Sequence, residues 1–205
     1  MFRTALKTVK ENLREYVLLN LLYYGLVVAS MAYTYAFPEV QEELMQELRM
    51  EFPEAFPWVV EAYTKGDFPM AAALTFSVNL ILGSVAYITL PSLIIPFGGI
   101  VAGCARAIAW GLLLAPTSPE LAWAMIPHSL TLILEGQGYV LAVFAAYIQW
   151  KGVIWPKSMR EEKRLKAYLT GISKTAHIYI LVTFVLAIAA IYEAFEVIYI
   201  VGKLR

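Results

Sequence analysis

The sequence is short of charged residues: they fill 16% of its 205 positions, against about 25% in a typical soluble domain. Hydrophobic residues fill 60%, more than a soluble domain of this length could bury in its core. Acidic and basic residues balance to a formal net charge of zero, so no basic surplus indicates a nucleic-acid partner. The composition therefore predicts an integral membrane protein whose apolar surface faces the lipid bilayer.

Cysteine and histidine are also scarce. Cys104 is the single cysteine, which excludes a disulfide within the chain, and His128 and His177 lie far apart, without a metal-binding spacing. The zinc-enzyme pattern of two histidines around a glutamate does not occur. Ser129 adjoins His128, but neighbouring residues on a helix do not face each other, so no activated nucleophile is evident. We predict no enzymatic activity, no metal site and no cofactor.

Five apolar runs are long enough to cross a bilayer as helices, which takes about 20 residues each. We predict an all-α fold: one polytopic transmembrane helix bundle covering residues 1–205, with about five spans. The predicted spans are 16–37, 69–90, 98–114, 122–150 and 177–201. The fourth is too long for one straight crossing, so we expect it to tilt or to break near Pro127.

The charged residues are sorted by segment. Residues 1–15 alternate apolar and basic faces at helical spacing, which predicts an interfacial amphipathic helix, with a solvated helix as the alternative. Residues 38–68 are acidic and contain a short amphipathic helix predicted to stop at Pro53, either a solvated cap resting on the bundle or a docking surface. Residues 151–176 are basic and predicted to be a loop. The positive-inside rule then places the N-terminus and the basic loop in the cytoplasm of a multi-pass cell-membrane protein.

Pro91, Pro96, Gly98 and Gly99 interrupt an apolar stretch that contains no charge. Each proline removes a helical hydrogen bond, and glycine tolerates conformations that other residues avoid. Broken backbone at membrane depth must be buried in protein or face a water-filled cavity. We predict a broken or re-entrant segment over 91–99, with a plain short loop as the alternative.

A small residue occupies every fourth position of the third span, at Gly99, Gly103, Ala107 and Gly111. Small side chains allow another helix to approach closely, which is how membrane helices associate. We expect close helix packing along this stripe, and self-association of the chain through it is one use that it would serve.

Polar and ionisable side chains interrupt four of the predicted spans, at Asn79, Arg106, His128, Glu135, Glu193 and Glu196. An unpaired charge at the bilayer centre costs about 2.5–3.5 kcal/mol, so these groups are expected to pair inside the bundle. His128 and Glu135 are seven residues apart and share one helix face. We predict an Arg106–Glu135 ion pair with Asn79 close by. We also predict that His128 lies near Glu193.

Two interpretations of this cluster stay open. In the first, the polar contacts fix which helix meets which, and nothing passes through or reacts. In the second, the groups line a cavity open to the outside of the membrane and handle a proton, a cation or a small polar solute. A transporter of the second kind would give a solute flux that changes with pH.

The order of features from Ser77 to Trp150 carries a resemblance: an asparagine-bearing span, a short polar turn and the segment PHSLTLILEGQGYVLA. The tail AIAAIYEAFEVIYI, which contains Glu193, continues the same pattern. In these features the chain resembles the stage II sporulation protein M family of integral membrane proteins. The resemblance implies a non-catalytic membrane scaffold or assembly component that works with other membrane proteins. A scaffold is therefore the expected function, and a channel or transporter is the alternative.

Overall fold

The computed structural model describes residues 1–159 and 161–201, which form helices joined by short turns. The helices are α1 (Phe2–Glu11), α2 (Leu13–Ala36), α3 (Pro38–Ala55), α4 (Pro57–Thr64), α5 (Phe68–Ser77), η1 (Val78–Thr89), α6 (Leu90–Ile94), α7 (Gly98–Leu114), α8 (Pro119–Ile154), η2 (Pro156–Met159), α9 (Arg164–Phe195) and η3 (Glu196–Ile200). Of these, η1 and η3 are π-helical and η2 is a 3₁₀ turn. The predicted all-α bundle is confirmed.

Four helical stretches within the described residues are long and apolar enough to cross a membrane: Leu13–Ala36, Phe68–Ile94, Pro119–Ile154 and Arg164–Ile200. A fifth apolar helix, α7, has 17 residues and rises about 25 Å, slightly less than the ~30 Å of a bilayer's hydrocarbon core. The prediction of about five spans thus corresponds to four long helices and one shorter one.

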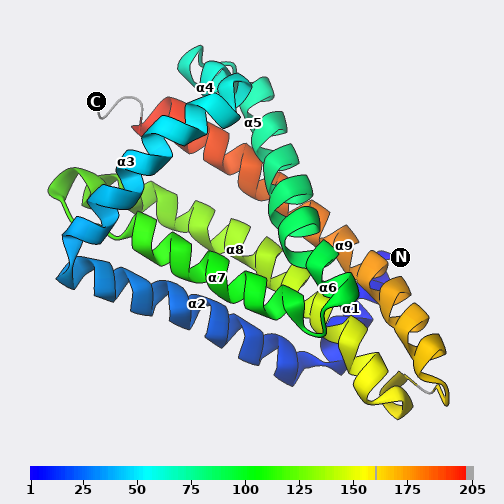
Figure 1. Ribbon diagram of the computed structural model, residues 1–205. Helices are drawn as coiled ribbons and strands as arrows, with labels where there is room; N and C mark the ends of the chain where they lie inside the picture. The colour runs from blue at the N-terminus through cyan, green and yellow to red at the C-terminus, as the bar shows by residue number, and fades with distance from the viewer. Residues whose placement is uncertain (160, 202–205) are drawn as a thin grey trace.

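The two ends of the bundle differ. Figure 1 shows α2, α7 and α8 lying together, while α5 leans away from α2 and α7 towards one end. There α3 crosses from the end of α2 to α4, which leads into α5. We call α3 and α4 the hood, and this end the hooded end. At the opposite end, the basic end, lie α1 and the turn between α8 and α9.

The second half of α8 is the centre of the fold, because nearly every residue from Gly138 to Gln149 is buried. α9 packs closely along it: a Cβ added to Gly138 would lie 2.4 Å from Leu186 Cδ2. Thr175 Oγ1 donates a hydrogen bond of 3.1 Å to the Ala145 carbonyl. α8 continues through Pro127, so the break considered near that residue does not occur.

Two predicted boundaries are wrong. α3 does not stop at Pro53 but continues to Ala55, because a proline near a helix end removes one hydrogen bond without forbidding the remaining turn. The acidic segment 38–68 therefore holds two helices rather than one short helix. The predicted basic loop 151–176 is mostly helical, since Lys, Arg, Ala and Leu favour helices whatever their charge. The turn between α8 and α9 covers 155–163, of which residue 160 lies outside the described part.

The proline-rich segment is a tight turn. The chain is helical through Pro91 to Ile94 and becomes extended at Ile95, and Phe97 takes a left-handed φ of 56° before α7 begins at Gly98. The break is therefore confined to residues 95–97, and the short-loop alternative describes it better than a re-entrant segment.

Side chains from two other helices replace a hydrogen bond that this turn loses. In a continuous helix the Ser92 carbonyl would accept from the N–H of residue 96, but Pro96 has none. Trp150 Nε1 and Gln149 Nε2 of α8 donate to that carbonyl instead. Tyr168 Oη of α9 donates a 2.7 Å hydrogen bond to the next carbonyl, at Leu93. The turn is thereby attached to the core helices.

The small-residue stripe of α7 is buried along its whole length. An added Cβ would lie 2.6 Å from Ala146 Cβ at Gly99, 2.3 Å from Val143 Cγ2 at Gly103, and 2.4 Å from the Val27 carbonyl oxygen at Gly111. The expected close packing is present, against α8 and α2 of the same chain. Self-association through this stripe is wrong, because intramolecular packing already covers it.

The amphipathic N-terminal segment forms α1 and ends at Glu11, before the first long helix starts. It packs on α9, where the rings of Phe2 and Phe184 meet edge to face at 6.2 Å. Lys151 of α8 fixes the junction between α1 and α2, donating to Asn12 Oδ1 at 2.7 Å and to Glu15 Oε1 at 2.9 Å.

The hood is fastened at both ends. On α3, Gln41 Nε2 donates to the carbonyls of Leu113 (2.7 Å) and Ala115 (2.9 Å) at the end of α7, and Thr117 donates to Gln41 Oε1. These carbonyls have no donor within α7 because the helix ends there. On α4, the hydroxyls of Tyr63 and Thr75 are 2.8 Å apart, which ties the hood to α5.

We expect the substitution Gln41→Ala to loosen α3. It leaves the Leu113 carbonyl without this donor, while the Ala115 carbonyl keeps the Thr117 N–H, which corresponds to about 1–3 kcal/mol of local stability. Amide hydrogen exchange of α3 should accelerate, while exchange in α8 stays unchanged. Gln46→Ala is the control, because Gln46 lies on the same helix but is exposed. Equal exchange in the two variants would contradict the role given to Gln41.

Candidate functional site

A cavity of about 540 Å³ lies at the hooded end, where α5 leans away from α7 and the hood covers the gap. α3 and α4 form its outer wall, and α5, η1, α7, α8, α9 and η3 contribute the remaining sides. The cavity is partly open to the surface of the protein. It exists because two neighbouring spans diverge and a folded connection closes over them.

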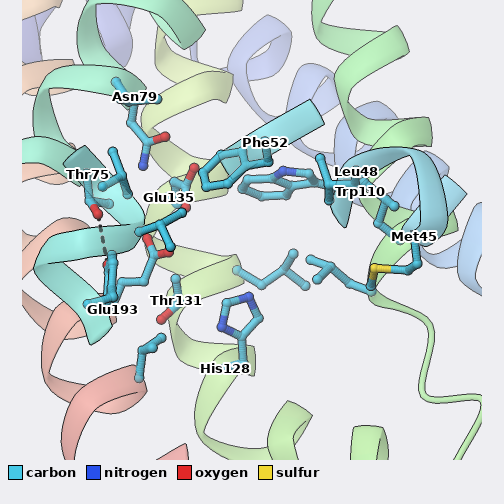
Figure 2. Close-up of a pocket in the computed structure, with 18 of the residues that line it drawn as sticks. Met45, Leu48, Phe52, Thr75, Asn79, Trp110, His128, Thr131, Glu135 and Glu193 are labelled. Carbon is cyan, nitrogen blue, oxygen red and sulfur yellow. Dashed lines mark hydrogen bonds between the residues drawn. The ribbon is translucent and has the colours of Figure 1, made fainter. Parts of the chain in front are cut away.

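The cavity has a polar side and an apolar side. Figure 2 shows a group of polar side chains gathered on one side: Thr75, Asn79, Thr131, Glu135 and Glu193. On the other side of the view lie apolar side chains from the hood and α7: Met45, Leu48, Phe52 and Trp110. His128 also borders the cavity. The arrangement suits a molecule with one polar and one apolar part.

The Arg106–Glu135 pair closes the inner part of the cluster. Arg106 Nη2 lies 3.5 Å from Glu135 Oε1, with side chains 22% and 9% exposed. Tyr139 links the two: its hydroxyl donates to Glu135 Oε1 at 2.8 Å and accepts from Arg106 Nη2. The guanidinium also lies over the Tyr139 ring, 3.8 Å from its centroid. The structure thus brings together the predicted pair, and the buried Asn79 lines the same cavity as Glu135.

The expected proximity of His128 to Glu193 needs a correction. Both border the cavity, but the partner of His128 Nδ1 is Glu196 Oε1, at 2.6 Å. Thr131 Oγ1 donates to the other oxygen of Glu196 at 2.6 Å, so this buried carboxylate is satisfied on both sides. Glu193 and Glu196 are three residues apart on one helix face, and sequence spacing does not decide which of them a histidine on another helix meets.

Glu193 differs from the other two carboxylates of the cluster. Its Oε2 is buried, and among residues 1–159 and 161–201 it has no hydrogen-bond partner. The other buried side-chain atoms in this condition are Tyr23 Oη, Ser92 Oγ, Arg106 Nε and Gln149 Oε1. None of those residues lines the cavity, and Glu193 does. Buried polar atoms are normally paired, so an unpaired carboxylate oxygen beside a cavity marks a position where a water molecule or a ligand would bind.

Sequence reasoning missed several members of this site. Tyr139 was detectable, because it follows Glu135 by one helical turn, but tyrosine also packs in cores without any polar role. Leu48 and Phe52 belong to the amphipathic helix expected within residues 38–68, and the structure places both against the cavity. Nothing in the sequence indicated that this helix would cover an opening.

In the part of the chain that the structure describes, no group of three or more His, Cys, Asp or Glu side chains is placed to hold a metal ion. No protein-family model matches the chain, and no curated protein or solved structure matches it. The function is therefore inferred from the chemistry of the site itself.

Proposed function

We propose that the protein binds a small solute in this cavity and moves it across the membrane, as a channel or transporter for a cation or small polar solute. The observation that carries the proposal is the Glu193 carboxylate, which borders a cavity of about 540 Å³ with a buried oxygen that no described residue satisfies. Contacts that only hold helices together satisfy each other, as His128 and Glu196 do.

The interior of α8 supports a transporter more than an open channel. On the basic-end side of Tyr139, the α8 residues Val140, Phe144 and Ile148 are fully buried against neighbouring helices. Passage beyond the Arg106–Glu135 pair therefore needs helices to move. The stretch η1, which carries Asn79, is π-helical, and π-turns are rare and occur frequently at functional sites, which supports a functional role for this side of the cavity.

The distribution of charged residues supports one orientation of the protein in the membrane. By the positive-inside rule, the basic end, with α1 and the turn between α8 and α9, lies in the cytoplasm of a cell membrane. The hooded end and its cavity then face the outside. The proposed protein takes up its solute from the extracytoplasmic side, or releases it there.

Purified protein in lipid vesicles tests the proposal. Influx of methylammonium, tetraethylammonium, potassium and glycerol should be measured, and at least one should cross faster than in protein-free vesicles. Glu193→Gln should lower that flux roughly tenfold or more, because it removes the charge that binds the solute. Glu47→Gln is the matched control, since Glu47 is exposed on the hood.

The scaffold implied by the resemblance to the sporulation protein M family stays the alternative prediction. It would give no flux with any of these probes, and Glu193→Gln would then change assembly with partner proteins rather than permeation. Vesicles that stay impermeable to all four probes would therefore overturn the transport proposal.

A further inference from the structure

We infer that the solute is an amphiphilic monocation: an ammonium group that pairs with Glu193, carried on an apolar body that lies against the hood. The inference rests on the proposed function, since it names the substrate class of the same cavity. It follows from the charges of the site, from the residues that line the cavity and from the volume of the cavity.

The charges of the site leave one carboxylate for a ligand. Glu135 is paired with Arg106, and Glu196 with His128 and Thr131. Glu193 is the remaining one, and none of the described residues that line the cavity is Lys or Arg. A carboxylate with one buried oxygen and no partner for it is unfavourable, so a single positive charge on the ligand would stabilise it. An anion would instead meet an additional negative charge.

The same carboxylate fits an organic ammonium better than a metal ion. Hard cations such as Ca²⁺ or Mg²⁺ are held by six or more oxygen ligands. The described residues provide no cluster of three acidic, histidine or cysteine side chains for one. An ammonium needs fewer partners, and Thr75 and Asn79 line the cavity with Glu193 as further polar groups.

The apolar side of the cavity is suited to the rest of such a molecule. Leu48 and Phe52 of the hood and Trp110 of α7 face the polar group across the cavity. A hydrated inorganic ion would leave these side chains in contact with water, whereas an alkyl or aryl group would cover them and gain about 25 cal/mol per Å². Aromatic rings also attract an adjacent ammonium group.

The volume agrees with an organic ligand. About 540 Å³ lies within the range of roughly 300–1,000 Å³ that is typical of sites for small organic molecules. The hood supplies the apolar wall of the cavity. Hydrogen bonds of Gln41 and Tyr63 attach it to α7 and α5, so its position over the cavity is fixed by specific contacts.

Calorimetric titration of the protein in lipid nanodiscs tests this inference. Three probes separate its parts: octyltrimethylammonium has both head and tail, octyl sulfate has the tail with the opposite charge, and tetramethylammonium has the head alone. After subtraction of empty nanodiscs, we expect saturable binding of octyltrimethylammonium. The other two probes should bind roughly tenfold more weakly or not at all, since each lacks one of the two interactions.

Two variants locate the binding. Glu193→Gln should weaken octyltrimethylammonium binding roughly tenfold or more, and Glu47→Gln should leave it unchanged. Leu48→Lys, at a hood position that is 41% exposed, brings an ammonium to the apolar wall and should weaken binding even if Glu193→Gln does not fold. Binding of octyl sulfate or tetramethylammonium as tight as that of octyltrimethylammonium, or full binding in the folded Glu193→Gln and Leu48→Lys variants, would overturn the inference.

The binding experiment in nanodiscs tests the substrate class, and the flux experiment in vesicles tests transport, so the two proposals can fail separately. Octyltrimethylammonium binding in nanodiscs without flux of any probe in vesicles would keep the inference and refute transport. Flux of potassium or methylammonium without octyltrimethylammonium binding would keep transport and refute the substrate class.

Discussion

Arg106→Met is expected to lower the free energy of unfolding by about 3–5 kcal/mol, because it leaves the carboxylate of Glu135 buried without its cation. The loss is large because the Glu135 side chain is buried, so solvent screens its uncompensated charge little. Tyr139 would keep its hydrogen bond to Glu135, but a single neutral donor does not balance a buried charge. Unfolding of the purified protein in mixed micelles with increasing denaturing detergent measures the change.

The double variant Arg106→Met with Glu135→Met distinguishes the pair from general packing. Replacing a buried ion pair by apolar residues of similar volume is frequently neutral, so most of the lost stability should return. Arg49→Met is the control for the arginine, since Arg49 is exposed on the hood, and it should change stability by less than about 0.5 kcal/mol. A double variant as unstable as Arg106→Met alone would show that the pair is not the source of the effect.

Gly111→Ala is expected to lower the free energy of unfolding by about 1–3 kcal/mol through overpacking. The added methyl would lie 2.4 Å from the Val27 carbonyl oxygen and 3.0 Å from the Met31 backbone nitrogen. Both are backbone atoms of α2, so the clash is relieved only by moving that helix away from α7. The same micelle unfolding assay measures the loss.

Gly25→Ala is the matched control on α2. An added Cβ there meets nothing within 4 Å, so alanine should gain up to about 1 kcal/mol from its higher helix propensity. The two substitutions are chemically identical and differ only in what the methyl group meets. If both changed stability in the same direction, the close approach of α2 and α7 at Gly111 would not be the cause.

Much of the fold followed from composition and spacing. The apolar surplus predicted a membrane bundle, and the high energy of an isolated charge in lipid predicted that Arg106 and Glu135 would meet, as they do. The small-residue stripe predicted close packing but not its partner, because a short side chain accommodates a helix of its own chain and a copy of it equally well.

The cavity did not follow from the sequence, because it depends on the angle between helices. Whether α5 stays beside α7 or leans away is decided by side chains on several elements at once. The hood was detectable as an acidic amphipathic segment, but its path across the opening depends on Gln41 reaching the end of α7. His128 pairs with Glu196 rather than with Glu193. The two glutamates lie one helical turn apart on the same face, so sequence spacing alone does not identify the partner.

The second half of α8 is enclosed by other helices, so lipid does not constrain which residues it contains. Other helices surround its second half, so for these residues the protein, not lipid, is the surrounding medium. Such a span is released from the requirement to be apolar. It carries Gln137, bound by Tyr16 at 2.7 Å and by Asn20 at 2.6 Å, and Gln149, bound to the turn carbonyl of Ser92. Bilayer solvation applies to the peripheral helices, while the central one obeys the rules of a water-soluble protein's interior.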